Sequence, residues 1–212
     1  VYADRFPQPD DERIGSVGVD NVKAANEAVR YLVGLGHQRI AVIAGPPSAR
    51  SSADRIEGYR RALAAQHLRL RRDRIRSGVS DMVAATREAI ELLARPDRPT
   101  ALFCGSNITT LGALDAVQQL GLRCPEEVSL LGFDDFSWST LLRPRLTMVR
   151  QPAREIGMTA ARLLIDHIEG RTRQGVGEHL LPTQLMIRNS CAPPQPTAPA
   201  GGRRARRALA VD

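Results

Sequence analysis

The stretch RIAVIAGPPSARSSADRIEGYRRALAAQ, residues 39–66, decides the fold of this chain. It opens with a short run of apolar and β-branched residues that stops at Gly45 and two prolines, which is typical of a buried parallel strand opening into a loop. Apolar residues at helical spacing then predict a helix from about Ser52 to Gln66. A strand, a loop and a helix in this order form the repeating unit of a parallel sheet.

The same alternation continues on both sides of this stretch. Upstream, apolar positions from Asn21 to Val33 predict a helix that Gly34 and Gly36 stop. Downstream we expect strands near Arg74–Ser77, Ala101–Cys104, Val128–Phe133 and Thr147–Arg150, helices over Met82–Ala94, Thr110–Leu120 and Ala153–Glu169, a short helix near Phe136, and an extended segment His179–Ile187. The alternation predicts an α/β fold with doubly wound parallel sheets. The apolar side of the helix over Ala153–Glu169 is expected to lie mostly in the core.

Length and composition are those of an ordinary globular chain. The 212 residues are 42% hydrophobic and 25% charged, which suits one large domain or two small ones. No apolar run approaches the roughly eighteen residues that a membrane helix requires, so we expect no membrane partner. Because the chain opens at Val1 without an initiator Met or a basic and apolar leader, we expect an interior fragment of a longer protein.

The net charge of +7 does not indicate a nucleic-acid surface on this chain. Much of it belongs to the arginines of residues 191–212, a stretch rich in Pro, Ala, Gly and Arg without apolar periodicity, which we expect to be a disordered tail. The remaining basic residues are spread over helices without interleaved aromatic residues, as on ordinary solvated surfaces.

Cysteine and histidine usage gives no sign of a metal site or a disulfide framework. The three cysteines Cys104, Cys124 and Cys191 are odd in number and far apart, which favours a reducing cytoplasm. The four histidines are also far apart, so no zinc-type pair is visible. We expect neither a metal nor a cofactor.

Polar residues collect where the predicted strands end, and ligands of open α/β sheets bind beyond the carboxyl ends of strands. These residues are Ser48, Arg50, Ser51, Arg55, Ser106, Asn107, Asp134, Asp135 and Gln151. Arg, Asp, Asn and Gln satisfy both the hydrogens and the lone pairs of a hydroxyl-rich ligand, so a sugar is the natural expectation. The alternative is structural: Asn107 and Asp134 cap helices and Arg55 pairs with a neighbouring acid.

Several segments resemble the lactose/galactose-repressor (LacI/GalR) family of bacterial transcription regulators. They are HQRIAVIAGPPSARSSADRIEGYRRAL, ALFCGSN, LGALDAVQQLGLRCPEEVSLLGFDD, PRLTMVRQPAREIG and LMIRNS. GFDD followed at a fixed distance by P-x-L-T-x-V-x-Q-P is the most specific of them. The resemblance runs from Asp4 to Ser190 and implies a regulator without catalysis.

The resemblance implies a periplasmic-binding-protein-like type I fold of two subdomains, joined by three crossovers, with the effector in the cleft between them. Residues 1–35 and 152–178 would form an incomplete N-terminal subdomain, and residues 36–151 and 179–190 the C-terminal one. A helix-turn-helix preceding Val1 would bind operator DNA in the parent protein, which would act in the cytoplasm as a homodimer. The dimer would use helix faces of both subdomains, and the helix over Ala153–Glu169 would lie either in the core or partly at that interface.

The family's effector contacts fall on Arg55, Asn107, Asp134 and Gln151, which the strand-end argument selected independently. Ser51 matches a further contact, and Asp4 and Arg5 match a pair that touches ligand in sugar-binding relatives. Two departures from the family matter. No aromatic residue precedes the helix at Met82, where Gly78–Asp81 stand, so stacking on a sugar face or a purine ring is absent there, which leaves room for a larger ligand or moves the apolar wall elsewhere. Ala49 stands where the purine-type members have an arginine, which disfavours a purine.

Two other functions remain open at this point. A periplasmic sugar-binding protein of an uptake transporter would have the same architecture and nearly the same ligand residues. An enzyme would need a nucleophile, a base or a nucleotide fingerprint, and the chain has no G-x-S-x-G, no G-x-x-x-x-G-K-[ST] and no G-x-G-x-x-G. Asp134 and Asp135 are unsuited as a carboxylate pair, because neighbours after a strand point to different sides.

Overall fold

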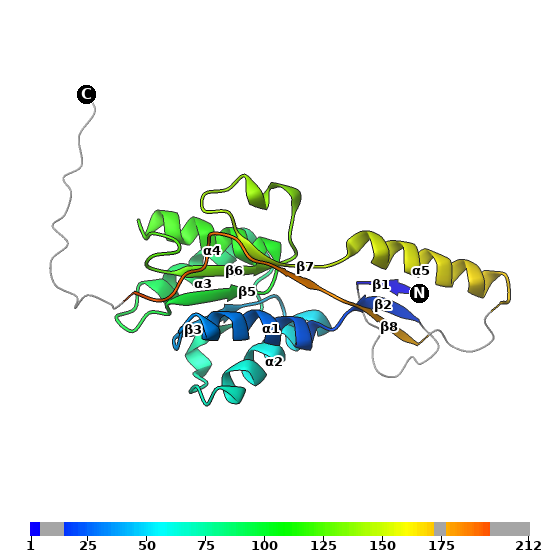
Figure 1. The fold of residues 1–212 in the computed structure, drawn as a ribbon, viewed down its shortest axis with the longest axis horizontal. Helices are drawn as coiled ribbons and strands as arrows, with labels where there is room; N and C mark the ends of the chain where they lie inside the picture. Colours follow the sequence, from blue (N-terminus) through cyan, green and yellow to red (C-terminus); the bar gives the residue numbers. More distant parts are fainter. Residues whose placement is uncertain (5–14, 172–176, 196–212) are drawn as a thin grey trace, which may run out of the picture.

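The structure, a computed structural model, describes residues 1–4, 15–171 and 177–195. These residues form two bodies of unequal size that lie side by side (Figure 1). The large body contains α1 (Asn21–Gly34), β3 (Ile40–Ile43), α2 (Arg50–Ala65), η1 (Arg72–Arg74), β4 (Ile75–Arg76), α3 (Met82–Leu93), β5 (Ala101–Cys104), α4 (Asn107–Gln119), β6 (Ser129–Phe133), η2 (Ser137–Thr140), β7 (Thr147–Arg150) and β9 (Gln184–Met186). The small body contains β1 (Tyr2–Ala3), β2 (Ser16–Val19), α5 (Ala153–Ile168) and β8 (Glu178–Leu181).

Each body is built on its own sheet. The large body has the strand order β4-β3-β5-β6-β7-β9, in which all neighbours are parallel except the antiparallel pair β7 and β9. The small body has the order β1-β2-β8, with both pairs parallel. The predicted α/β class with parallel sheets is therefore confirmed.

Helices cover both faces of the large sheet, which explains why its strands read as continuous apolar runs. Alternate residues of β3 face opposite sides: Val42 packs with α1 and α2, whereas Ala41 and Ile43 pack with α3 and α4. All four residues of β3 are consequently buried. In the small body, α5 packs on β2 through Ile156 and Ala160.

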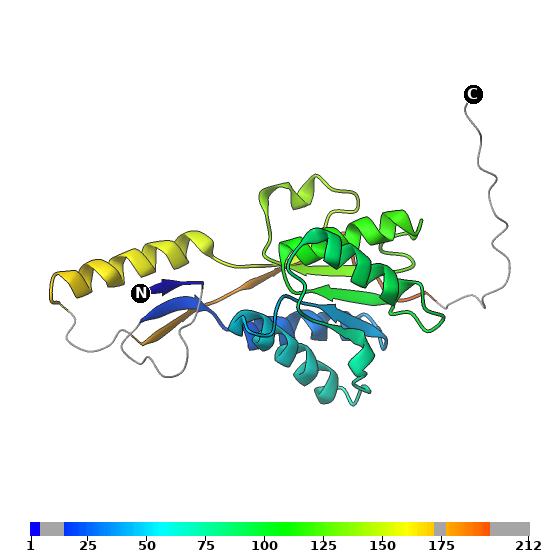
Figure 2. The ribbon, with the colours of Figure 1, turned by 180° about the vertical axis from the view of Figure 1, so that it is seen from behind.

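Three connections join the two bodies within the described residues. The chain passes from β2 to α1 at Asp20, from β7 to α5 at Gln151 and Pro152, and from β8 to β9 at Pro182 and Thr183. Both views show these segments passing between the bodies (Figures 1 and 2). They match the three crossovers that the resemblance implied.

The expected division of the chain at residue 35 is wrong. Helix α1 belongs to the large body, because Ala25, Ala28 and Leu32 are buried against α2 and the six-stranded sheet. The first crossover therefore lies at Asp20, before the helix rather than after it. The segment 179–190 was also assigned to one subdomain, but β8 pairs with β2 of the small body and only β9 pairs with β7.

The predicted start of the disordered tail, residue 191, is too early in the chain. Cys191 packs against the large core, and the backbone N–H of Ala192 donates to Ser129 Oγ at 3.1 Å. The Ala192 carbonyl lies 3.0 Å from Nε2 of the buried His37. These contacts hold the end of the described chain against β6. Residues 196–212 of the expected tail lie outside the described residues.

The expectation that α5 is mostly core is also wrong. Only Ile156 and Ala160 of this helix are buried. Met158, Leu164, Ile165 and Ile168 are exposed, with Met158 at 61%. The small body offers α5 three strands within the described residues, and that narrow sheet covers only one stripe of the helix.

Helices α1 and α2 approach so closely that only a glycine fits at position 58. A Cβ added to Gly58 would overlap the Val22 carbonyl oxygen and lie 2.7 Å from Ala25 Cβ. We expect Gly58→Ala to lower the free energy of unfolding by about 1–3 kcal/mol, as overpacked cores do. Gly157 in α5 has open space around its Cβ position, so Gly157→Ala should be neutral or stabilise by roughly 0.5–1 kcal/mol. Urea unfolding of both variants checks this, and equal effects would contradict it.

Candidate functional site

The predicted residues that meet in the structure are grouped around Arg55, in the second turn of α2. Its Nη1 donates to the carbonyl oxygen of Gly105 at 2.6 Å, after β5, and its Nε donates to Asn21 Oδ1 at 2.8 Å. Its guanidinium carbon lies 3.7 Å from the centre of the Phe133 ring, at the end of β6. Arg55 is only 6% exposed, so these contacts replace the water that the cation has lost.

Asp134 lies between Arg55 and Gln151. Its Oδ2 is 3.5 Å from Arg55 Nη1, and its Oδ1 accepts from Gln151 Nε2 at 2.5 Å. The backbone of Asp134 has φ of +67°, a left-handed conformation that is uncommon for a residue with a side chain. Gln151 Oε1 is buried and has no hydrogen-bond partner among the described residues. The three residues form one polar group at the ends of β6 and β7, beside the crossover to α5.

The small body contributes Asp4 to this group. Asp4 follows β1, where its backbone N–H donates to the Val17 carbonyl oxygen at 2.8 Å. Burial lowers the pKa of Arg55, and the carboxylates of Asp134 and Asp4 act against that shift. The charge of a carboxylate from each body therefore acts on the same buried cation. Arg5, the other predicted contact of this segment, lies outside the described residues.

Asn107 and Ser51 are placed differently. Asn107 is the first residue of α4 and exposed, and its Oδ1 accepts from the backbone N–H of Ile108 at 2.7 Å. The cap residue of α4 is Ser106 and that of η2 is Phe136, so neither Asn107 nor Asp134 caps the helix that follows it. Ser51 is half-buried in the first turn of α2. Within the described part of the chain, both stay outside the hydrogen-bonded group around Arg55.

Asp135 points away from Asp134, as the sequence predicted for neighbours after a strand. Arg188 Nη2 donates to its Oδ2 at 2.8 Å, Arg150 Nη2 donates to the same oxygen at 2.7 Å, and Ser139 Oγ donates to its Oδ1 at 2.7 Å. Burial alone would raise the pKa of Asp135, but the hydrogen bonds from Arg188, Ser139 and Arg150 outweigh it and lower the pKa to about 2. This network fixes the loop that carries Asp134.

Sequence reasoning missed Asn21 and Phe133. Asn21 is 2% exposed and accepts from Arg55, yet it was counted only as the start of a helix. A signal was present, because Asn21 lies on the same face of α1 as the buried Ala24, Ala25 and Ala28. A polar residue on an apolar face must find a polar partner elsewhere. Phe133 was read as the end of a strand, and nothing in its position indicated a cation above its ring.

Two features are absent from the described residues. Within the described ranges, no group of three or more His, Cys, Asp or Glu side chains is placed to hold a metal ion. None of the helices that the structure describes is both long and apolar enough to cross a membrane.

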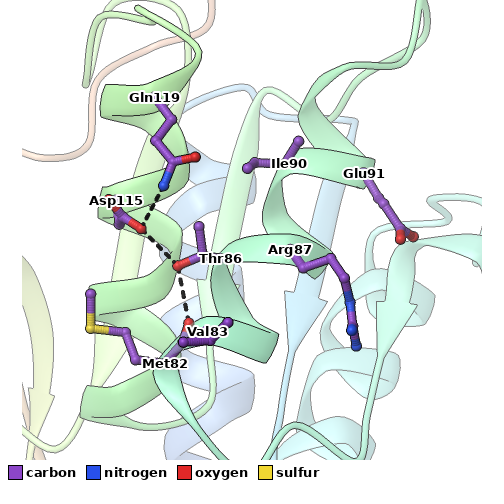
Figure 3. A pocket seen from close by; sticks show the side chains of 8 residues that line it. All are labelled: Met82, Val83, Thr86, Arg87, Ile90, Glu91, Asp115 and Gln119. Atoms are coloured by element: carbon purple, nitrogen blue, oxygen red, sulfur yellow. Dashed lines mark hydrogen bonds between the residues drawn. The ribbon is translucent and has the colours of Figure 1, made fainter.

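A hollow of about 450 Å³ lies between α3 and α4 (Figure 3). Thr86 Oγ1 donates to Asp115 Oδ2 at 3.0 Å, and Gln119 Nε2 donates to the same oxygen at 2.9 Å. The remaining lining residues are Met82, Val83, Arg87, Ile90 and Glu91. None of these residues belongs to the group around Arg55, so this hollow is a separate feature.

Comparison with known proteins places most of the chain in one family. The family described as "Periplasmic binding protein-like domain" matches residues 29–191. The HTH-type transcriptional repressor CytR of Escherichia coli (strain K12) is 38% identical over 175 residues, which are 82% of this chain and 51% of the repressor. The chain thus spans about half the length of the curated relatives it matches.

Solved structures agree with this assignment. A structure described as the transcriptional regulator CelR–cellobiose complex matches with a TM-score of 0.80 and 35% identity, over 84% of this chain and 54% of that one. A LacI family transcriptional regulator from Enterococcus faecium with bound ribose matches with a TM-score of 0.76 and 27% identity, over 85% and 66% of the two chains. Both relatives were solved with a sugar.

The Asp135 network predicts a pH-dependent stability difference. The pKa of about 2 lies below the ordinary value of 3.8, so the unfolded state binds more protons between pH 4 and pH 2 and stability is lost as the pH falls through that window. At pH 7, Asp135→Asn should lower the free energy of unfolding by about 2 kcal/mol. Urea unfolding at several pH values should show the difference between wild type and variant shrinking below pH 4. A difference that is constant down to pH 2 would contradict this explanation.

Proposed function

We propose, from the premise that this chain belongs to the LacI/GalR family of transcription regulators, that it is the effector-binding core of such a regulator. The effector is a small polar, sugar-like molecule that binds between the large and small bodies. The observation that carries this proposal is the group of Arg55, Asp134 and Gln151 at the strand ends, beside the crossover to α5. The charge of Asp4 in the small body acts on the same cation. A ligand bound at this group would contact residues of both the large and the small body.

The chemistry of this group suits a molecule rich in hydroxyls. Asp134 accepts hydrogen bonds, Arg55 donates them, and Gln151 Oε1 is a buried acceptor that needs a donor. The relatives solved with cellobiose and with ribose support a sugar. The proposed contacts are Asp4, Arg5, Ser51, Arg55, Asn107, Asp134 and Gln151. Because no aromatic residue lies in Gly78–Asp81 and Ala49 replaces an arginine, a purine fits less well.

The ligand acts by shifting a conformational equilibrium. A molecule bound to both bodies favours one angle between them, and it changes the equilibrium only by its different affinities for the two arrangements. In the whole regulator this angle would change the spacing of DNA-binding segments and hence the affinity for operator DNA. The regulator would act in the cytoplasm.

A catalytic function has no support in the site. Asp134 and Asp135 point to different partners, so they do not share a proton as paired catalytic carboxylates do. The thiol of Cys104 is buried, and burial raises its pKa far above its usual range, which leaves no reactive thiolate. The similar proteins reported above are transcriptional repressors and regulators, which also disfavours a transport protein of the same architecture.

We also propose that the regulator is a homodimer in which the hollow between α3 and α4 contributes to the interface. Val83 protrudes at its edge with 80% exposure, and Ile108 is exposed at the start of the neighbouring α4. Arg87 and Asp115 supply both signs of charge around the apolar floor. A protrusion, a hollow and charges of both signs on one face allow that face to complement a second copy of itself in a two-fold contact.

A thermal-shift screen tests the ligand proposal. We expect cellobiose, ribose or another member of a panel of mono- and disaccharides to raise the melting temperature of the wild type, because a ligand that binds the native state stabilises it by mass action. Asp134→Ala should abolish the shift. Because this variant also removes the counter-charge of the buried Arg55, its melting temperature without ligand should fall, and its shift is measured from that lower value. Asp166→Ala, which removes a half-buried carboxylate of α5 that pairs with Arg171, is the matched control and should keep the shift. An undiminished shift in Asp134→Ala would contradict the site.

Sedimentation velocity tests the dimer. Val83→Asp places a charge on the proposed interface and should convert a dimer into a monomer at micromolar concentration. Leu70→Asp alters an exposed apolar residue that does not line the hollow, and it should leave the dimer intact. A wild type that sediments as a monomer, or a Val83→Asp variant that remains a dimer, would contradict the proposed interface.

A further inference from the structure

The first crossover carries a side chain that reaches into the site. Asn21 is the first residue of α1, directly after Asp20, which caps the helix. Its Oδ1 accepts from Arg55 Nε at 2.8 Å, and its Nδ2 donates to the Val19 carbonyl oxygen at 3.3 Å. Val19 is the last residue of β2. One buried amide therefore connects Arg55 of the large body to a strand of the small body.

The second crossover is connected to the same group. Gln151 lies between β7 and α5, and its Nε2 donates to Asp134 Oδ1. Arg55 Nη1 donates to Asp134 Oδ2. The hydrogen bonds thus run without interruption through Val19, Asn21, Arg55, Asp134 and Gln151, from one crossover to the next. We call these five residues the crossover relay.

The links of the crossover relay differ in length. Arg55 and Asp134 are 3.5 Å apart, at the limit of a hydrogen bond, whereas Asn21 and Arg55 are 2.8 Å apart. A ligand bound to Asp134 and Arg55 would lengthen or replace the longer of these hydrogen bonds, the one between Arg55 and Asp134. The tighter link holds the guanidinium plane over the Phe133 ring and so fixes the direction of its free N–H groups.

We propose that Asn21 is a positioning residue with two separable roles. Its acceptor orients Arg55 for the ligand, and its donor restrains the angle between the two bodies at the β2–α1 connection. Through the crossover relay, a change at Asp134 or Arg55 reaches both crossovers. The first role rests on the proposed function, since it concerns the ligand, whereas the second is a property of the chain alone.

Two substitutions separate these roles, and a third controls for the loss of an amide. Asn21→Asp keeps an acceptor for Arg55 Nε but has no N–H for the Val19 carbonyl, and an acidic residue is favourable in the first turn of a helix. Asn21→Ala removes both links. Asn26→Ala removes another amide of α1, whose Nδ2 donates to the Gly58 carbonyl oxygen at 3.5 Å and which lies outside the crossover relay.

The angle between the bodies is measured without any ligand, by single-molecule energy transfer. Fluorophores are attached to azide-bearing residues that replace Met158 on α5 and Gln66 after α2, both exposed, so that the native cysteines stay unlabelled. Wild type and Asn26→Ala should give one narrow distribution. Asn21→Ala and Asn21→Asp should both give a broader or shifted one. Distributions identical to wild type in both Asn21 variants would overturn the restraining role.

The orienting role is measured by calorimetric titration with cellobiose and with ribose. For the sugar that binds, Asn21→Asp should retain the wild-type Kd within about threefold and Asn21→Ala should weaken it about tenfold or more. Equal Kd values for Asn21→Ala and wild type, or equal losses in both Asn21 variants, would overturn this role. If neither these sugars nor any other ligand of the panel binds the wild type, the proposed function fails, and the energy-transfer result still decides whether Asn21 restrains the bodies.

Discussion

The burial of one cation, Arg55, is the constraint on which the arrangement of the site depends. A guanidinium that is 6% exposed needs acceptors and a counter-charge close by, because an uncompensated buried charge is strongly destabilising. Here those partners come from three places in the chain: Asn21 at the first crossover, the Gly105 carbonyl after β5, and Asp134 after β6. Satisfying Arg55 therefore requires these three segments to meet at one edge of the sheet, next to the small body.

A second network supports the first without taking part in it. Arg188 and Arg150 hold Asp135, and this fixes the loop in which Asp134 adopts its left-handed backbone conformation. The two neighbouring aspartates thus have different roles. Asp135 is saturated by hydrogen bonds within the large body, whereas Asp134 keeps one short and one long contact. A carboxylate that is fixed in place but incompletely bonded is suited to bind a ligand.

The local pattern of apolar and polar residues was enough to predict much of this structure, whereas the remaining features depend on contacts between segments that are distant in the sequence. Strands β3, β5 and β6 of the large sheet are buried on both faces, so their apolar runs were visible in the sequence. The rule that polar residues collect at strand ends selected Arg55, Asp134 and Gln151, which the structure brings together. The sequence of α1 shows an apolar face but not which sheet covers it, so the first crossover was placed after the helix instead of at Asp20. For the same reason the amphipathic pattern of α5 predicted burial, although Ile165 and Ile168 are exposed. The segment from residue 191 was predicted to be a disordered tail because the residues after Ala192 are rich in Pro, Ala, Gly and Arg, and this composition gave no sign of the contacts that Ala192 makes.

The central claim is that a sugar binds between the two bodies at the group around Arg55. A crystal structure of the chain grown with the sugar that raises its melting temperature most tests this directly. The account predicts density for the sugar within hydrogen-bond distance of the Asp134 carboxylate and Gln151 Oε1, in contact with residues of both bodies. Density in the hollow between α3 and α4, with Asp134 and Gln151 still bonded only to protein, would contradict it.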